Sequence, residues 1–216
     1  MLSSLTFIMP NTTAEFFGII ALILHLTGYA IYGWSVFHEW GRPHVLTWFM
    51  WLGGGIVEYA TYQAIPGAHW SNNALPLACV LGLGFITLAI IVAKVKSWFK
   101  GTEYSYEPPE KKDYLLFGFD AGSGWLWWTQ VWSAALANFV AVGTSIFTFI
   151  PLWRTVYKDP DTEHYLPWII WTAAYMAMFL TVLTGPEPEQ WELYMYPVSY
   201  FLFHAIVTVL SLRVKK

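Results

Sequence analysis

Ionisable side chains interrupt several of the long apolar stretches of this chain. Glu58, His25 and His204 are the clearest cases, and Asp120 lies in a weaker stretch. A charge within a bilayer is costly, so such groups usually face protein or water and mark proton or solute pathways. We predict that Glu58 is a proton-exchange site, with His25 and His204 within reach as further proton-coupling groups. The alternative is a protonated, hydrogen-bonded acid that joins neighbouring helices.

Two tryptophan pairs, Trp48 with Trp51 and Trp168 with Trp171, have a spacing of three residues. This spacing places both members of a pair on one helix face, where they could stack a sugar or a vitamin ring. The alternative is an aromatic belt at the membrane surface. The amide of Asn138 could bind a solute hydroxyl or join two helices. We therefore expect solute contacts from Trp48, Trp51, Glu58, Asn138, Trp168 and Trp171.

The elements that carry these residues are predicted to be transmembrane helices. The chain has 216 residues, of which 56% are hydrophobic and 12% charged, about half the charged share of a soluble domain. A membrane span needs about 20 mostly apolar residues. Six stretches qualify and the stretch 113–130 is weaker; the six are 14–37, 45–65, 74–95, 130–153, 165–184 and 194–213.

The 11 lysines and arginines predict the direction of the crossings, because cytoplasmic loops collect these residues. With seven spans and the N-terminus outside, loops 38–44, 96–112 and 154–164 and the C-terminal tail all face the cytoplasm, and all 11 basic residues lie in them or at the adjoining ends of the spans. Without the weak span, every basic residue after position 153 would lie outside. We expect seven helices, a cytoplasmic C-terminus and location in a bacterial inner membrane.

The two halves of the chain resemble each other at an offset of about 120 positions. The motif WFMW at 48–51 recurs as WIIW at 168–171, and Pro76 corresponds to Pro197. Each half is predicted to be a three-helix unit, over 14–95 and 130–216. One further helix in the linker 96–129 would make the two units parallel. The expected fold is all-α, with a 3+1+3 order of transmembrane helices.

This plan resembles the SWEET and PQ-loop superfamily of membrane proteins. Phe149-Ile150-Pro151-Leu152 is similar to the proline–glutamine motif, with Leu152 in place of the glutamine. Arg42-Pro43-His44 ahead of the first tryptophan pair resembles a group of uncharacterised bacterial SWEET-like proteins, and the paired tryptophans are similar to those of the PnuC vitamin transporters. The resemblance implies alternating access between two three-helix bundles, with Pro151 as a hinge.

We therefore expect a transporter or facilitator of a small polar solute, sugar-like or vitamin-like, within the lipid bilayer. The alternative is a non-transporting membrane subunit or scaffold, and either function is compatible with a homo-oligomer or a larger membrane complex. A net charge of −3 argues against nucleic-acid binding. The sequence has no metal-ligand or nucleophile motif, so we expect no enzyme activity, no cofactor and no catalytic residue.

Overall fold

The computed structural model describes residues 12–38, 43, 45–101, 111–130 and 132–213. Within these ranges the chain is entirely helical, as expected from the sequence, and forms no strand. The helices are α1 (Thr13–Phe37), α2 (Val45–Gln63), α3 (Trp70–Lys100), α4 (Lys111–Trp128), α5 (Ala134–Lys158), the short 3-10 helix η1 (Pro160–Thr162), α6 (Tyr165–Leu183) and α7 (Glu192–Ser211).

Five of the described helices are long and apolar enough to cross a membrane, namely α1, α3, α5, α6 and α7. The chain is therefore a helical, membrane-embedded protein. Helices α2 and α4 do not reach the same standard of apolar composition. In α2 this follows from Glu58 and the three consecutive glycines 53–55, and in α4 from a stretch that contains Asp120 and three glycines.

Local sequence signals begin and end these helices. Thr12 and Glu15 form a reciprocal capping box at the start of α1, and Ser133 caps α5 by accepting a hydrogen bond from the Leu136 amide. Gly101 ends α3 in the left-handed conformation, with a φ of 64°. Residues 96–100, which we expected to begin a loop, are therefore the last helical turn of α3.

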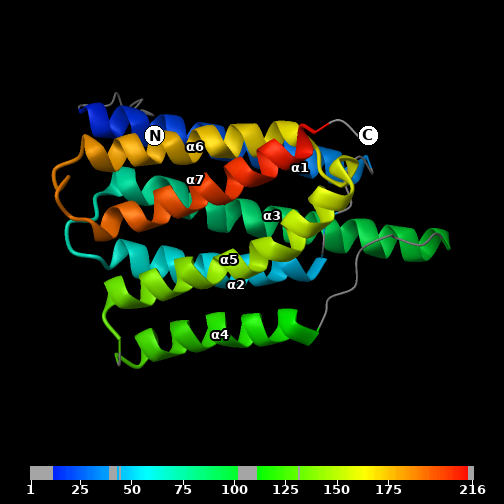
Figure 1. Ribbon diagram of the computed structural model, residues 1–216, viewed down its shortest axis with the longest axis horizontal. Coiled ribbons are helices and arrows are strands. Elements are labelled where there is room, and N and C mark those ends of the chain that lie inside the picture. The colour runs from blue at the N-terminus through cyan, green and yellow to red at the C-terminus, as the bar shows by residue number, and fades with distance from the viewer. Residues whose placement is uncertain (1–11, 39–42, 44, 102–110, 131, 214–216) are drawn as a thin grey trace, which may run out of the picture.

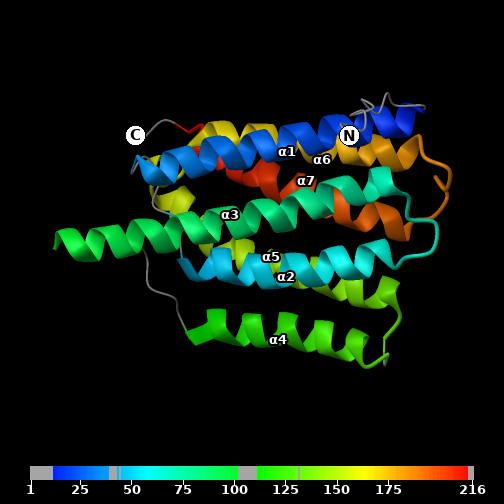
Figure 2. The ribbon, with the colours of Figure 1, turned by 180° about the vertical axis from the view of Figure 1, so that it is seen from behind.

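The seven helices run alternately in opposite directions, so that the two described ends of the chain lie at opposite ends of the bundle (Figures 1 and 2). Six of them form a closed ring in the order α1, α3, α2, α5, α7, α6, with α6 returning to α1. Helix α4 packs outside the ring against α5 and α2. The ring encloses the central residues of the protein.

Charge distinguishes the two ends of the bundle. Every lysine and arginine that the structure describes belongs to the end where α3, α5 and α7 finish, which we call the basic end. Its described basic side chains are Lys94, Lys96, Lys100, Lys111, Arg154, Lys158 and Arg213. The opposite end, where α1 and α7 begin, carries Glu15, Glu187, Glu189 and Glu192 and is called the acidic end.

Glycine allows α1 and α3 to approach closely near the centre of the bundle. A Cβ atom added to Gly82 of α3 would overlap the ring of Tyr29 of α1. By contrast, a Cβ atom on Gly84, two residues further along α3, would meet nothing closer than Leu52 Cδ1 at 4.0 Å. The side chain of Tyr29 is therefore held against a bare stretch of backbone.

This contrast predicts different effects for two identical substitutions. Gly82→Ala should lower the free energy of unfolding by about 1–3 kcal/mol, because the added methyl group must displace a buried ring. Gly84→Ala should be neutral or slightly stabilising, because alanine favours helix and has room here. Thermal unfolding of both variants in the same detergent measures the difference. Equal melting temperatures would contradict this packing.

Candidate functional site

A buried cavity lies at the centre of the helical ring. All six ring helices contribute to its described lining and α4 does not. The lining residues are Tyr29, Trp48, Trp51, Gly54, Gly55, Glu58, Cys79, Leu83, Ser145, Phe149, Trp168, Trp171, Tyr175, Tyr200 and His204. The cavity offers about 30 Å³ to the centres of water-sized spheres, which is room for about two water molecules.

Helical spacing explains how α2 and α6 aim their side chains at this cavity. In α2 the lining residues Trp48, Trp51, Gly55 and Glu58 follow one another at steps of three or four and therefore share a face. The same steps separate Trp168, Trp171 and Tyr175 in α6. Glycines 54 and 55 also line the cavity, and a Cβ atom on Gly55 would meet Leu83 Cδ1 at 2.9 Å, so Leu83 packs against bare backbone there.

The four tryptophans form an aromatic box with matching dimensions in its two halves. The ring centroids of Trp48 and Trp51 are 5.1 Å apart, and those of Trp168 and Trp171 are 5.0 Å apart. The two cross-pairs, Trp51 with Trp168 and Trp48 with Trp171, are each 6.4 Å apart. All four tryptophans predicted to contact a solute are therefore brought together.

The next rings outward repeat the same geometry. Tyr29 of α1 lies 5.0 Å from Trp171, and Phe149 of α5 lies 4.9 Å from Trp51. The indole of Trp171 donates to the backbone oxygen of His25, whereas the indole of Trp51 donates to the Thr148 hydroxyl at 2.6 Å. The two ring contacts are thus counterparts 120 positions apart, whereas the acceptors of the two indole hydrogen bonds differ in kind and in position.

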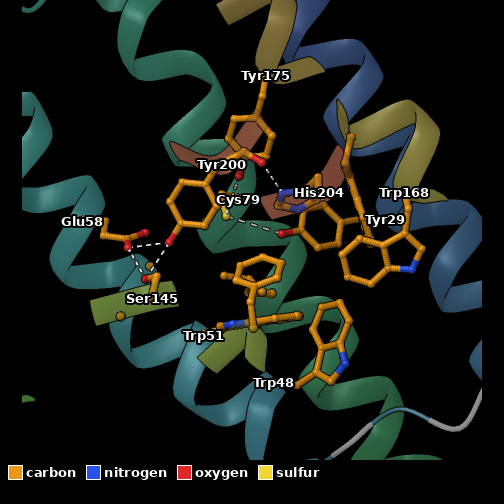
Figure 3. A pocket seen from close by; sticks show the side chains of 15 residues that line it. Tyr29, Trp48, Trp51, Glu58, Cys79, Ser145, Trp168, Tyr175, Tyr200 and His204 are labelled. Atoms are coloured by element: carbon orange, nitrogen blue, oxygen red, sulfur yellow. Dashed lines mark hydrogen bonds between the residues drawn. The ribbon is translucent and has the colours of Figure 1, made fainter. Parts of the chain in front are cut away.

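Glu58 is buried beside this box and has two hydroxyl partners. Its Oε1 atom accepts hydrogen bonds from Ser145 Oγ of α5 at 2.9 Å and from the Tyr200 hydroxyl of α7 at 2.5 Å. Figure 3 shows the three side chains pointing toward one another at one side of the cavity. This arrangement can hold either a proton on the carboxyl group or a positive charge next to it.

The two histidines predicted to assist Glu58 differ in position. His204 lines the cavity, and its Nδ1 atom lies 2.8 Å from the backbone oxygen of Tyr200. His25 lies behind the lining, with edge-to-face contacts to Tyr29 and Tyr175. Neither ring nitrogen of His25 has a hydrogen-bond partner among the described residues. The two hydrogen bonds described for the Glu58 carboxyl group come from the hydroxyl groups of Ser145 and Tyr200.

Other predicted residues lie outside the cavity lining. The Asn138 amide donates to the backbone oxygen of Glu58 at 3.1 Å and to Thr61 Oγ1 at 3.0 Å, so it fastens α5 to α2. Pro151 is buried within α5, beyond the lining residue Phe149. The side chain of Asp120 lies outside the described residues.

Several lining residues were missed by the sequence interpretation. Ser145, Tyr200 and Cys79 are common residue types in apolar helices and carried no distinctive motif. The Cys79 sulfur lies 3.4 Å from the Tyr29 hydroxyl and 4.0 Å from the Tyr175 hydroxyl. The offset of about 120 positions would have found Phe149 as the counterpart of Tyr29, because both face a tryptophan pair.

A second buried carboxyl group closes the basic end of the cavity. Glu163, between η1 and α6, accepts hydrogen bonds from the Tyr32 hydroxyl of α1 and from the Trp168 indole, each at 3.1 Å. The Tyr32 ring in turn packs 4.8 Å from Trp48. We call Tyr32, Glu163 and Trp168 the basic-end latch, because they join α1 to the start of α6 above the tryptophan box.

At the acidic end, Tyr62 of α2 performs the corresponding closure. Its hydroxyl donates to the backbone oxygen of Leu193 at 3.0 Å, and its ring packs 5.5 Å from Tyr196. The turn after α2 also contacts the turn before α7, where a Cβ atom on Gly67 would collide with Gln190. Contacts between the two halves of the chain therefore lie toward both ends of the bundle.

Among the described residues, no three histidine, cysteine, aspartate or glutamate side chains gather closely enough to hold a metal ion. Comparisons of the chain with known protein families, curated proteins and solved structures give no significant match. The assignment of function therefore depends on the geometry and chemistry of the cavity and its two closures.

The basic-end latch predicts a pH-dependent stability. Burial raises the pKa of Glu163 from 4.5 to about 7, against the opposing effect of the hydrogen bonds from Trp168 and Tyr32. Because the folded state binds this proton more tightly than the unfolded state, stability is greatest below pH 4.5 and falls as the pH rises to about 7. The expected loss for this group is about 3 kcal/mol.

Unfolding measured from pH 4 to 8 in one detergent tests this expectation. Glu163→Gln should remove most of the decline, because the amide does not titrate. Glu192→Gln, the same change at the acidic end, should leave the decline in place. A parallel decline in wild type and Glu163→Gln would show that Glu163 is not its source.

Proposed function

We propose that this protein is a transporter or facilitator of a small polar solute, which moves by alternating access between two three-helix units. The observation that carries the proposal is the central cavity, which lies between the units and is lined by both tryptophan pairs, with separate contacts between the units toward each end of the bundle. A carrier needs a central site between two units and contacts that can break separately at either end.

The helix contacts support two equivalent units, α1–α3 and α5–α7. In each unit the third helix packs between the first two, giving the pairs α1·α3 and α2·α3 in one and α5·α7 and α6·α7 in the other. The two largest contacts between units, α1·α6 and α2·α5, exchange when the units are interchanged, whereas the smaller α3·α6 contact has no counterpart of similar size. Helices α1 and α5 also run in the same direction (Figure 1). These features support parallel repeats in a 3+1+3 order.

The paired distances in the tryptophan box support the same relationship. Interchanging the units maps each tryptophan pair onto the other and maps Tyr29 onto Phe149, and the corresponding centroid distances agree within 0.1 Å. A solute in the box would therefore lie on the approximate two-fold axis between the units. This supports the resemblance to SWEET, PQ-loop and PnuC proteins as the source of the mechanism.

The charge distribution supports an orientation in the membrane. If the basic end is cytoplasmic, the N-terminus lies outside and all seven helices cross, in accordance with the rule that cytoplasmic loops collect lysine and arginine. In this reading α2 crosses despite its polar residues because its Glu58 face is turned to the cavity. Helix α4 crosses alone outside the ring and links the two units. The membrane would be a bacterial inner membrane.

A second candidate function is a non-transporting subunit of a membrane complex. The small volume of the cavity, about 30 Å³, favours this reading, because the aromatic side chains fill most of the centre. The lone helix α4 also exposes Leu115, Phe119 and Trp128. A scaffold would keep its centre closed, whereas a carrier must open it.

Opening of the cavity can be measured with Cys79, the single cysteine of the chain, because it lines the cavity and is buried. In a carrier, a thiol reagent should alkylate Cys79 at least tenfold faster than a buried cysteine away from the cavity. The matched control is Cys79→Ala combined with Ala137→Cys, since Ala137 is fully buried on α5 and does not line the cavity. Equal rates at the two positions would favour the scaffold.

The same thiol distinguishes alternating access from a fixed opening. A membrane-impermeant reagent should reach Cys79 in right-side-out and in inverted vesicles. Tyr32→Ala, which removes one member of the basic-end latch, should increase the rate from the basic side and decrease it from the acidic side. An increase from both sides would indicate general loosening of the fold instead.

A further inference from the structure

The chemistry of the cavity lining identifies a class of solute. We propose that the solute is a small organic cation, whose positive centre lies among the tryptophan rings and pairs with the Glu58 carboxylate. This rests on the proposed transport function and adds to it the charge of the transported molecule.

The formal charges around the cavity favour a positive solute. The described lining contains the carboxyl group of Glu58 and no lysine or arginine. Ser145 and Tyr200 donate hydrogen bonds to Oε1 of that group and hold it at one side of the cavity. An anion would meet both the carboxylate and the negative faces of the aromatic rings. A neutral solute would leave Glu58 protonated and would therefore gain no ionic contact from it.

The aromatic box supplies the rest of the recognition. A cation is attracted to an aromatic face within about 6 Å of the ring centroid, most strongly to tryptophan. Neighbouring rings among the four tryptophans of the box have centroid separations of 5.0–6.4 Å. When the box opens around a ligand, one positive centre can therefore contact several indole faces at once. This geometry suits alkylated ammonium or heteroaromatic cations, which shed water more readily than a primary ammonium.

The solute and a proton would then compete for the same carboxyl group. In the empty state Glu58 would carry a proton, and binding of one monovalent cation would release it. The titratable groups that face Glu58 from the surrounding helices are Tyr29 of α1, Cys79 of α3, Tyr175 of α6, and Tyr196 and Tyr200 of α7, and His204 lines the same cavity. Phenols and thiols ordinarily titrate above about pH 8. Below that pH, the competing proton belongs to Glu58 or to His204.

The experiment compares cations with neutral molecules of the same shape. Choline is paired with 3,3-dimethylbutan-1-ol, and N-methylpyridinium with toluene, and each is tested for protection of Cys79 against alkylation. We expect at least one cation to protect at a concentration tenfold or more below that of its neutral partner. Its half-protecting concentration should fall about tenfold for each pH unit between pH 5 and 7. If no cation protects better than its neutral partner, the proposal is wrong.

Substitutions assign the effect to the carboxyl group. Glu58→Gln should abolish both the preference for the cation and the pH dependence. Glu58→Asp retains the carboxyl group and should keep both effects, and it provides the test if Glu58→Gln fails to fold. Glu192→Gln is the matched control outside the cavity and should behave as wild type. His204→Gln should keep the tenfold change of the half-protecting concentration per pH unit. If this pH dependence disappears in His204→Gln, the competing proton belongs to His204 and the proposed competition at Glu58 is wrong.

These outcomes are separable from failure of the transport function itself. The rate of Cys79 alkylation without ligand, relative to the Ala137→Cys control, reports whether the cavity opens. If it opens and neutral solutes protect as well as cations, transport stands and the charge assignment fails. If it does not open, both proposals fail together.

Discussion

A carboxyl group in the interior of an apolar helical bundle governs the rest of this structure. Placing an acid at the centre of a membrane helix costs about 2.5–3.5 kcal/mol, and more when it has no partner. The fold offsets this cost by bringing Ser145 of α5 and Tyr200 of α7 to Glu58 of α2. Those contacts span 87 and 142 positions in the sequence, so the carboxyl group joins the first three helices to the last three.

The surroundings of Glu58 combine symmetric geometry with asymmetric chemistry. The tryptophan box has nearly the same dimensions in both halves, yet the position 120 residues after Glu58 is the fully buried Met178. The position 120 residues before Ser145 is His25, whose ring nitrogens have no hydrogen-bond partner among the described residues. A requirement of folding alone would recur in both halves. The single acid therefore indicates a role that the cavity needs only once.

The same asymmetry appears at the ends of the cavity. The basic-end latch joins α1 to α6 through Glu163, and position 43, which corresponds to Glu163, is Pro43. The α2·α5 contact on the other side instead uses the Trp51 hydrogen bond to Thr148. Each contact between the units therefore contains one carboxyl group, Glu163 beside α1 and α6 and Glu58 between α2 and α5, but the two groups have different partners.

The sequence predicted the features that depend on local periodicity. Apolar runs located six of the seven helices, the distribution of basic residues required the seventh, and three-residue spacing placed each tryptophan pair on one face. It did not identify Ser145 or Tyr200 as partners of Glu58, because contacts between distant helices depend on the order in which they pack. Glu163 was missed because it follows Asp159 and Asp161 in a charged loop, where a solvent-exposed carboxylate is the usual expectation. The helical extension to Lys100 was missed because its basic residues resembled a cytoplasmic loop.

The central claim, that the two units move about the cavity, is tested most directly by distances between spin labels on α3 and α7. These helices lie in the middle of their units, and their exposed positions Leu77 and Val198 report on the acidic end, while Val95 and Val209 report on the basic end. In lipid nanodiscs, with Cys79 replaced, double electron–electron resonance should show two populations at each end. Conditions that lengthen one distance should shorten the other. A single narrow distance at both ends, unchanged between pH 5 and 8 and on addition of organic cations, would contradict alternating access.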